Sequence, residues 1–125
     1  MATTYSIEAA DLAQAAPEVQ DLWVRNLAGH DAYSAAAKLR LGYVDNPAGP
    51  GVVLLLKAAG LAAAQGAQGL HPRRFHLGES ALNAIGLADY VVSPEHRSLG
   101  PALMLARRSA QLGVERFDLT YGLPR

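Results

Sequence analysis

The chain changes from a strand pattern to a helix pattern between residues 90 and 105, and this change limits the folds open to it. Residues 90–92 form a short apolar run typical of a strand, and Pro94 ends it. Gly100 and Pro101 then open a run of apolar residues at helical spacing. A helix that starts so soon after a strand begins with backbone N–H groups that have no intrahelical partner. Those amides, together with the positive end of the helix dipole, attract anions.

The residue types around this helix start fit a bound pyrophosphate. Gly100 and Ala102 let a phosphate approach the backbone closely, and Arg97 can add a positive charge. Pro101 carries no N–H, but proline is tolerated in a first helical turn, and we expect donors at the N–H groups of 99, 100, 102 and 103. An ordinary strand–turn–helix with a tight glycine is the alternative. The predicted binding residues are Tyr90, Val91, Val92, Arg97, Ser98, Leu99, Gly100, Pro101 and Ala102.

Composition narrows the classes of function. The 125 residues suit one compact domain, and half of them are hydrophobic. Eleven basic residues balance eleven acidic ones, which argues against nucleic acid or an anionic membrane as a partner. The sequence has no cysteine, so it offers no disulfide, no thiol nucleophile and no cysteine-based zinc site. Its N-terminal residues do not resemble a signal peptide, and we expect a cytoplasmic protein without a metal.

Periodicity predicts a first strand and two helices in the first half of the chain. Residues 4–10 alternate as a half-buried strand does. A helix is expected to begin at Pro17 and end near Gly29, with Trp23 as a core anchor. Asp31 is a plausible N-cap for a second helix. The residues of that helix expected to face the core are Tyr33, Ala36, Ala37 and Leu41.

The second half predicts strands around the helix that follows Gly100. Residues 45–51 are turn formers and predict a loop, and 52–57 read as a buried strand. A returning strand is expected over 61–68, with a bulge marked by its glycines, and a loop with some ribbon over 70–81. Further predicted elements are a strand over 82–92, a helix ending at Gly113 whose core stripe is Leu99, Leu103, Ala106 and Ala110, and a strand over 117–123.

The spacing Arg97-x-x-Gly100-x-Ala102 after the apolar run at 90–92 resembles the acyl-CoA-binding motif of the GNAT family of N-acyltransferases. The family pattern is Gln or Arg, two residues, Gly, one residue, then Gly or Ala. The element order also matches the N-terminal portion of that family's fold. The resemblance implies an α/β (α+β) fold with a mixed, mostly antiparallel sheet and helices on both faces. It also implies that the pantetheine arm of CoA lies where strands 85–92 and 117–123 diverge.

The same resemblance implies an incomplete domain. Residues 1–125 would form a single GNAT-like domain that lacks the family's C-terminal helix and strands. The sheet would then end in an unpaired apolar edge, so we expect a homodimer through that edge. Both a truncated piece of a longer enzyme and a natural minimal protein are open as origins.

By resemblance, the activity is transfer of an acyl group from acetyl-CoA or another acyl-CoA to an amine. Asp89 is the candidate catalytic base, and amides near Val91 and Val92 would polarise the thioester carbonyl. The alternative for Asp89 is a strand-end carboxylate that binds nearby backbone or arginine. Family members often supply an acid from a tyrosine further along the chain, and Tyr121 lies too early to replace it. A non-catalytic acyl-CoA-binding or dimerisation module, and a structural fragment without a ligand, are the alternative functions.

Two further segments carry candidate residues. His71, Arg73, Arg74 and His76 lie close together, and without a neighbouring carboxylate or cysteine they do not predict a metal site. Their arginines could contact the 3′-phosphate of the cofactor or an acidic acceptor, and a solvated loop is the alternative. Residues 46–49 follow the second helix, where the family often forms the acceptor wall. A plain turn explains their composition equally.

Overall fold

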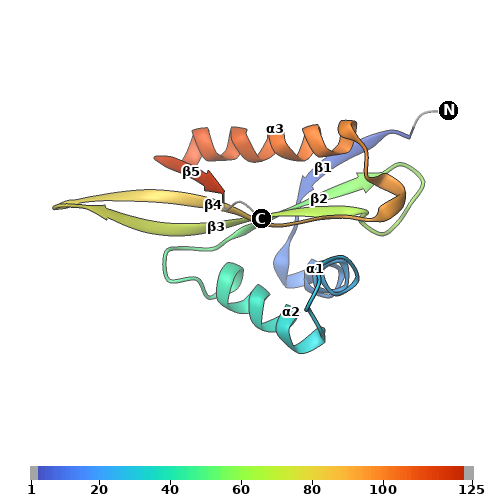
Figure 1. Ribbon diagram of the computed structural model, residues 1–125, viewed down its shortest axis with the longest axis horizontal. Coiled ribbons are helices and arrows are strands. Elements are labelled where there is room, and N and C mark those ends of the chain that lie inside the picture. Colours follow the sequence, from blue (N-terminus) through green and yellow to red (C-terminus); the bar gives the residue numbers. More distant parts are fainter. Residues whose placement is uncertain (1–2, 123–125) are drawn as a thin grey trace.

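The structure is a computed structural model that describes residues 3–122. Five strands form one sheet in the order β1-β2-β3-β4-β5. Helices α1 and α2 cover one face of the sheet and α3 covers the other (Figure 1). The predicted mixed α+β fold is confirmed. The elements are β1 (Tyr5–Ala9), α1 (Leu12–Asn26), α2 (Ala32–Leu39), the π-helical turn η1 (Arg40–Val44), β2 (Val52–Ala58), β3 (Gly66–Leu77), β4 (Ser80–Val92), the 3₁₀ turn η2 (Pro94–His96), α3 (Leu99–Arg116) and β5 (Leu119–Gly122).

Strands β1 to β4 are antiparallel neighbours, and β5 is parallel to β4. Each face of the sheet has its own apolar core. On one face, residues of α1 and α2 pack with β2 and β3; on the other, α3 packs with β2 and β4. Within residues 3–122 no helix is long and apolar enough to cross a membrane.

Helix α1 begins five residues earlier than its proline suggests, so the prediction of a start at Pro17 is wrong. Asp11 is the N-cap, and its side chain accepts a hydrogen bond of 3.1 Å from the N–H of Ala13. Pro17 lies near the N-terminus, where its missing N–H removes only one helical hydrogen bond. Burial of the apolar stripe further along, with Leu22 and Trp23 fully buried, offsets that loss. Trp23 is a core residue, as predicted.

Helix α2 has the predicted cap but not the predicted core face. Asp31 and Ser34 bond reciprocally to each other's backbone N–H groups, which forms a capping box. Tyr33 is 84% exposed, and Leu41 also faces outward; the buried residues are Ala35, Leu39 and Tyr43. The helix widens into η1, where the N–H of Asp45 donates to the carbonyl of Arg40 at 2.6 Å. Every fourth residue from Ala35 to Tyr43 is therefore buried, through α2 and into η1.

A hairpin occupies residues 70–81, where a loop with some ribbon was predicted. Strand β3 continues to Leu77 and pairs with β4 along its whole length, so the hairpin projects beyond the helices (Figure 1). The strand predicted over 61–68 begins only at Gly66. Residues 73–77 are exposed on both faces, and a strand without a buried face lacks the alternation by which strands are predicted. Phe75 packs instead against Tyr121 of β5.

A register shift between β3 and β4 lies at the predicted bulge, between Ala67 and Gly69. Ala67 pairs with Val91 and Gly69 with Ala88, so β4 holds the extra residue. Asp89 lies in this bulge with a φ of 57°, which a non-glycine side chain rarely adopts.

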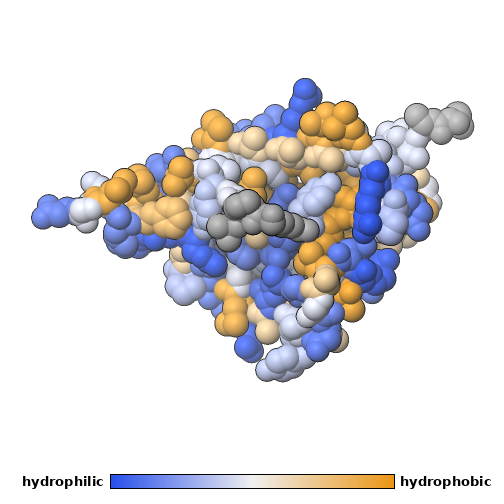
Figure 2. Space-filling view, in the orientation of Figure 1, coloured by the Kyte–Doolittle hydropathy of each residue, from blue (hydrophilic) through white to orange (hydrophobic). Residues whose placement is uncertain are grey.

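Helix α3 runs to Arg116, past Gly113, and turns a different face to the sheet. All four residues of the predicted stripe are exposed; Pro101, Leu105, Ser109 and Leu112 are buried instead. Ser109 can be buried because its hydroxyl donates to the carbonyl of Leu105 at 2.8 Å. Exposed Leu99, Leu103 and Val114 form apolar surface along α3, and exposed Phe75 and Leu77 form apolar surface on the projecting hairpin (Figure 2).

Candidate active site

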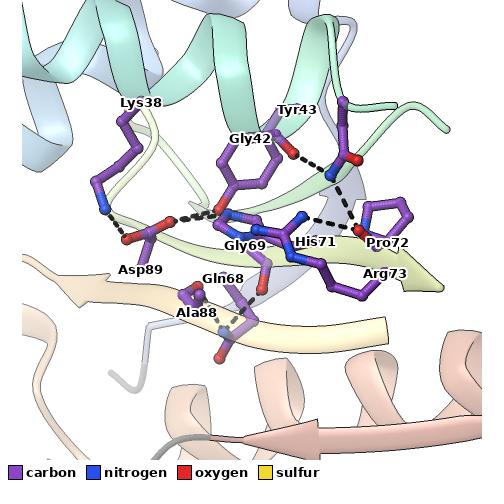
Figure 3. A network of polar contacts seen from close by, with 11 residues as sticks. Lys38, Gly42, Tyr43, Gln68, Gly69, His71, Pro72, Arg73, Ala88 and Asp89 are labelled. Carbon is purple, nitrogen blue, oxygen red and sulfur yellow. Dashed lines mark hydrogen bonds and ion pairs between the residues drawn. The ribbon is translucent and has the colours of Figure 1, made fainter. Parts of the chain in front are cut away.

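Four side chains from four elements meet on the α2 side of the sheet; we call Lys38, Tyr43, His71 and Asp89 the Asp89 cluster. The carboxylate of Asp89 accepts hydrogen bonds of 2.6 Å from Lys38 Nζ and 2.6 Å from Tyr43 Oη (Figure 3). His71 Nε2 lies 3.2 Å from Asp89 Oδ2. The Asp89 side chain is only 7% exposed. The bulge in β4 thus turns a carboxylate from the sheet into a nearly enclosed polar site.

The environment holds these groups in defined protonation states. Burial by itself would raise the pKa of Asp89, but the nearby imidazole of His71 and the hydrogen bonds from Lys38 and Tyr43 outweigh it and hold that pKa well below its usual range. Burial, followed by the negative charge of Asp89, raises the pKa of Tyr43 far above that of a free tyrosine. At neutral pH, Asp89 is therefore ionised and Tyr43 is a hydrogen-bond donor.

Close backbone contacts position this cluster. The wide turn η1 lays Gly42 against the imidazole of His71, so that a Cβ at Gly42 would lie 3.2 Å from Nε2. The rings of Tyr43 and His71 meet edge to face, with centroids 4.4 Å apart. Gly69 has no side chain where the hydroxyl of Tyr43 reaches toward Asp89.

The predicted helix start, which we call the 97–102 turn, has free donors. Ser98 is the N-cap, and its side chain makes no capping hydrogen bond. The N–H groups of Leu99 and Gly100, the first of α3, have no partner among the described residues. Ala102 was also expected to offer a donor, but its N–H donates to the carbonyl of Ser98 at 3.4 Å. Leu103 follows at a position where helical N–H groups bond within the helix.

Space is open above this turn. Apart from its chain neighbours and the adjoining backbone of α3, no atom lies within 4 Å of the position that a Cβ of Gly100 would occupy, and Gly100 is exposed. Pro101, the next residue, is buried, so it lies on the side of α3 that faces the protein interior. The N-terminus of α3 therefore has both the unpaired donors and the room that a phosphate group needs.

Arg97 is fastened beside the turn. Its Nε donates to the carbonyl of Val92 at 2.8 Å, and its guanidinium lies 3.4 Å from Asn26 Oδ1 of α1. On the other side, the hydroxyl of Tyr5 and Nδ1 of His96 form a hydrogen bond of 2.8 Å that ties β1 to η2. The segment between β4 and α3 is thus anchored at both of its flanks.

The last residues of β4 differ in where their amides point. The N–H of Ser93 donates to the carbonyl of Gln65, so the neighbouring pair, Gly66 and Val92, is a non-hydrogen-bonded one. The N–H and C=O of Val92 therefore point away from β3, and the hydrogen bond from Arg97 to the carbonyl of Val92 agrees with this. The N–H and C=O of Val91 point toward β3. Tyr90 lies in the bulge and is half-exposed.

On its other side, β4 is paired with β5 only from Ala84 to Leu87. In the described part of the chain, Val92 thus has no strand on the side to which its amide points. The predicted strand over 117–123 is observed over 119–122, and Leu123 lies outside the described residues. The predicted divergence of the two strands beyond Gly122 also lies outside them.

Sequence reasoning found Asp89 but not two of its partners. Lys38 and Tyr43 lie 51 and 46 residues before Asp89, and no local motif connects such positions. His71 was singled out, but as part of a basic cluster rather than as a neighbour of Asp89. Residues 3–122 contain no group of three or more His, Cys, Asp or Glu side chains that could hold a metal ion.

Two segments that were candidates separately in the sequence meet in space. An open pocket of about 520 Å³, the Arg73 pocket, is lined by Leu41, Asn46, Pro47, Ala48, Arg73 and Arg74. The candidate acceptor loop at 46–49 and the arginines of β3 thus share one site. It adjoins the Asp89 cluster, because Asn46 Nδ2 donates to the carbonyl of Pro72, the residue after His71.

No family model and no curated protein matches the sequence. Solved structures do match in fold. An aminoglycoside N-acetyltransferase in complex with CoA is 14% identical at a TM-score of 0.75, over 100% of this chain and 80% of that one. A ribosomal-protein-alanine N-acetyltransferase from Brucella melitensis biovar Abortus 2308 is 19% identical at a TM-score of 0.67, over 98% of this chain and 81% of that one. A GNAT family acetyltransferase from Staphylococcus aureus subsp. aureus USA300_TCH1516 is 12% identical at a TM-score of 0.66, over 100% of this chain and 88% of that one.

These likenesses in fold extend over almost the whole chain, although the sequences are only 12–19% identical. The similarity, at TM-scores of 0.66 to 0.75, extends to acetyltransferases of several kinds. The chain therefore has the fold of the GNAT superfamily of acetyltransferases.

Proposed function

We propose that this protein is an acyl-CoA-dependent N-acyltransferase that transfers an acyl group from acetyl-CoA, or another acyl-CoA, to an amine. One observation carries the proposal. The unpaired N–H groups of Leu99 and Gly100 lie just past the end of β4, where the amide of Val92 points away from its neighbouring strand. A diphosphate and a thioester carbonyl need donors of this kind. The fold shared with structures that contain CoA supports the proposal.

The predicted residues that offer a free donor or a charge have a part in the proposed reaction. The N–H groups of Leu99 and Gly100 bind the pyrophosphate of the co-substrate, and Arg97 adds its charge beside them. The open space above Gly100 fits a phosphate group. The N–H of Val92 donates to the thioester oxygen as negative charge develops there. An amide held by a sheet needs little reorganisation to do this.

In the proposed transfer, the amine nitrogen bonds to the acyl carbon and the C–S bond breaks. The sulfur leaves as a thiolate that takes a proton, and the nitrogen loses one. Asp89 is the proposed base. Its lowered pKa makes Asp89 a weak base, so it would take the proton only after the bond to the acyl carbon has formed and the nitrogen has become far more acidic. His71 Nε2 lies 3.2 Å from the carboxylate that would receive that proton.

Binding of acetyl-CoA, measured by thermal shift and calorimetry, tests the first half of the proposal. The ligand should raise the melting temperature of the wild-type protein. Arg97→Glu should abolish that rise, because it places a negative charge beside the phosphates and releases the anchor to Val92. Arg107→Glu, the same charge reversal at an exposed position further along α3, is the control and should bind normally. If Arg97→Glu bound as well as the control, the proposed location would be wrong.

Release of free thiol from acetyl-CoA in the presence of a panel of amines tests the second half. Amine-dependent release that is lost in Asp89→Asn would support the enzyme. Binding of acetyl-CoA without release for any amine would support the alternative function, a non-catalytic acyl-CoA-binding or dimerisation module. Absence of both would leave a structural domain without this ligand.

Self-association through β5 belongs to the same proposal. This strand lies at the edge of the sheet and pairs with β4 over four residues, and Leu119 is partly exposed. An edge strand presents backbone donors and acceptors to a second chain. Light scattering coupled to gel filtration should show a homodimer at micromolar concentration. A monomer at every concentration would contradict this part.

A further inference from the structure

The Arg73 pocket has a charge pattern that indicates what binds in it. Two arginines line it, and its other lining residues are Asn46, Pro47, Ala48 and Leu41, so it contains no acidic group. Neither Arg73 nor Arg74 forms an ion pair with a carboxylate in the described part of the chain. Asp45 precedes Asn46 but does not line the pocket. Guanidinium groups bind carboxylates and phosphates in a fixed, often bidentate geometry.

The part of the pocket wall formed by Asn46 is held in place by hydrogen bonds. Asn46 is buried, and its Nδ2 donates to the carbonyls of Gly42 and Pro72 at 3.0 Å each. Its Oδ1 accepts from the N–H of Ala48 at 2.9 Å. Asn46 is therefore fully used in holding the loop and has little left to offer a ligand. A binding wall that is already ordered costs little entropy when a ligand arrives.

Arg73 is positioned by the same carbonyl that holds Asn46. Its Nη1 donates to the oxygen of Pro72 at 2.9 Å, and its remaining donors have no protein acceptor among the described residues. Side chains alternate along a strand, so Arg73 lies on the same face of β3 as His71. The charge of Arg73 also acts on the hydroxyl of Tyr43, lowering its pKa slightly against the larger effects of burial and Asp89. The pocket and the Asp89 cluster are thus electrostatic neighbours.

The net charge of this region is positive. The Asp89 cluster pairs one carboxylate with Lys38, and Tyr43 is protonated and uncharged. Arg73 and Arg74 then add positive charge that no carboxylate of the pocket balances. A cationic acceptor, such as a polyamine, would be repelled here, whereas an acceptor with an anionic group would be attracted.

We propose that the acceptor is a primary amine that also carries a carboxylate or phosphate group, which Arg73 holds in the Arg73 pocket while the amine faces Asp89. The apolar side chains of Leu41 and Pro47 contact the carbon chain between the two groups. This proposal rests on the proposed acyltransferase function and names its class of acceptor. The same arrangement that attracts the anion keeps the amine directed toward the base.

Amines of matched size test the charge preference. The acceptors are 4-aminobutyrate, its neutral amide and 1,4-diaminobutane, with phosphoethanolamine and ethanolamine as a second pair. Thiol release from acetyl-CoA should show a KM for 4-aminobutyrate roughly tenfold below that for the amide, the size expected for one charge-assisted hydrogen bond in a partly open site. Diaminobutane should be the poorest acceptor. A neutral or cationic acceptor with the lowest KM would overturn the proposal.

Substitution of Arg73 tests whether this residue produces the preference for an anionic acceptor. Arg73→Gln should raise the KM for 4-aminobutyrate roughly tenfold and leave the KM for its amide unchanged. Arg73→Lys should recover part of the loss. Arg107→Gln removes a charge from an exposed position on α3 and is the matched control. Equal KM changes for both acceptors in Arg73→Gln would show a merely structural role and would overturn the assignment.

A binding experiment without acetyl-CoA separates this inference from the proposed function. Titration with 4-aminobutyrate should shift the Arg73 Nε–Hε resonance in a ¹H–¹⁵N spectrum, and the amide should not. If this shift occurs but no thiol is released, the pocket stands and the acyltransferase function fails. If thiol is released with some amine but Arg73 does not respond to 4-aminobutyrate, the function stands and the anionic acceptor is wrong. Absence of both the shift and thiol release would overturn both.

Discussion

The hydroxyl of Tyr43 occupies the space in which a side chain at Gly69 would otherwise lie. A Cβ built at Gly69 would collide with that hydroxyl and would lie 2.8 Å from the carbonyl of Ala88. The same hydroxyl donates a 2.6 Å hydrogen bond to Asp89. The absence of a side chain in β3 therefore permits a contact between η1 and the bulge of β4.

Gly69→Ala should destabilise the protein by about 2 kcal/mol, because the new methyl group must displace a buried aromatic ring or the neighbouring strand. Urea unfolding monitored by circular dichroism measures the change. Gly100→Ala is the matched control, because its methyl group meets no atom within 4 Å. Equal stability of the two variants would contradict the packing described for Tyr43.

Asp89→Asn should change how stability depends on pH. The folded-state pKa of Asp89 lies below its usual value, so its contribution to stability is present above about pH 4 and is lost as the pH falls toward that lowered pKa. At pH 7 the variant should be less stable by roughly 2 kcal/mol, since it keeps Lys38 and Tyr43 but removes the charge they bind.

Between about pH 4 and pH 2 the difference between wild type and Asp89→Asn should shrink. Urea titrations at several pH values give both curves. Asp21→Asn removes a carboxylate from an exposed pair with Arg25 and should follow the wild-type curve closely. Parallel curves for wild type and Asp89→Asn would show that the cluster does not hold Asp89 in its ionised form.

Tyr5→Phe should weaken both acetyl-CoA binding and the fold, each to a small extent. The phenol bonds His96 across 91 residues of sequence and holds η2 just ahead of the 97–102 turn. Loss of one partly buried hydrogen bond costs about 1 kcal/mol of stability. The looser turn should raise the dissociation constant of acetyl-CoA several-fold, measured by calorimetry. Tyr33→Phe, at an exposed position, is the control, and equal affinities would exclude this role for Tyr5.

Gly113→Ala should loosen the packing of α3 on β5, because its methyl group would collide with the hydroxyl of Thr120. The expected loss is roughly 2 kcal/mol. Thr120→Ala removes the colliding atoms, so the double variant should be more stable than Gly113→Ala alone. Thermal unfolding of the four proteins gives the coupling between the two sites. Additive losses would contradict this contact.

Much of the local structure could be predicted because it depends on neighbouring residues. Asp31 caps α2, the turn formers at 45–51 make a loop, and the uninterrupted apolar run from Val52 makes a central strand. The start of α3 after Pro94 also follows from backbone preferences close in the sequence. Where a long-range contact decides, the predictions failed: the face of α3, the face of α2 and the hairpin at 70–81 all depend on what lies across the sheet.

The sequence by itself determined the element order and the open helix start around Gly100, because turn residues and hydrogen-bond donors act over a few positions. Only the tertiary structure decided the surroundings of Asp89. Lys38, Tyr43 and His71 reach it from α2, η1 and β3, and the bulge that turns it toward them exists only when β3 and β4 pair. The arginines of β3 likewise meet the 46–49 loop only in the folded chain. Side chains far apart in sequence are brought together by burial of the two apolar faces of the sheet, which no local pattern records.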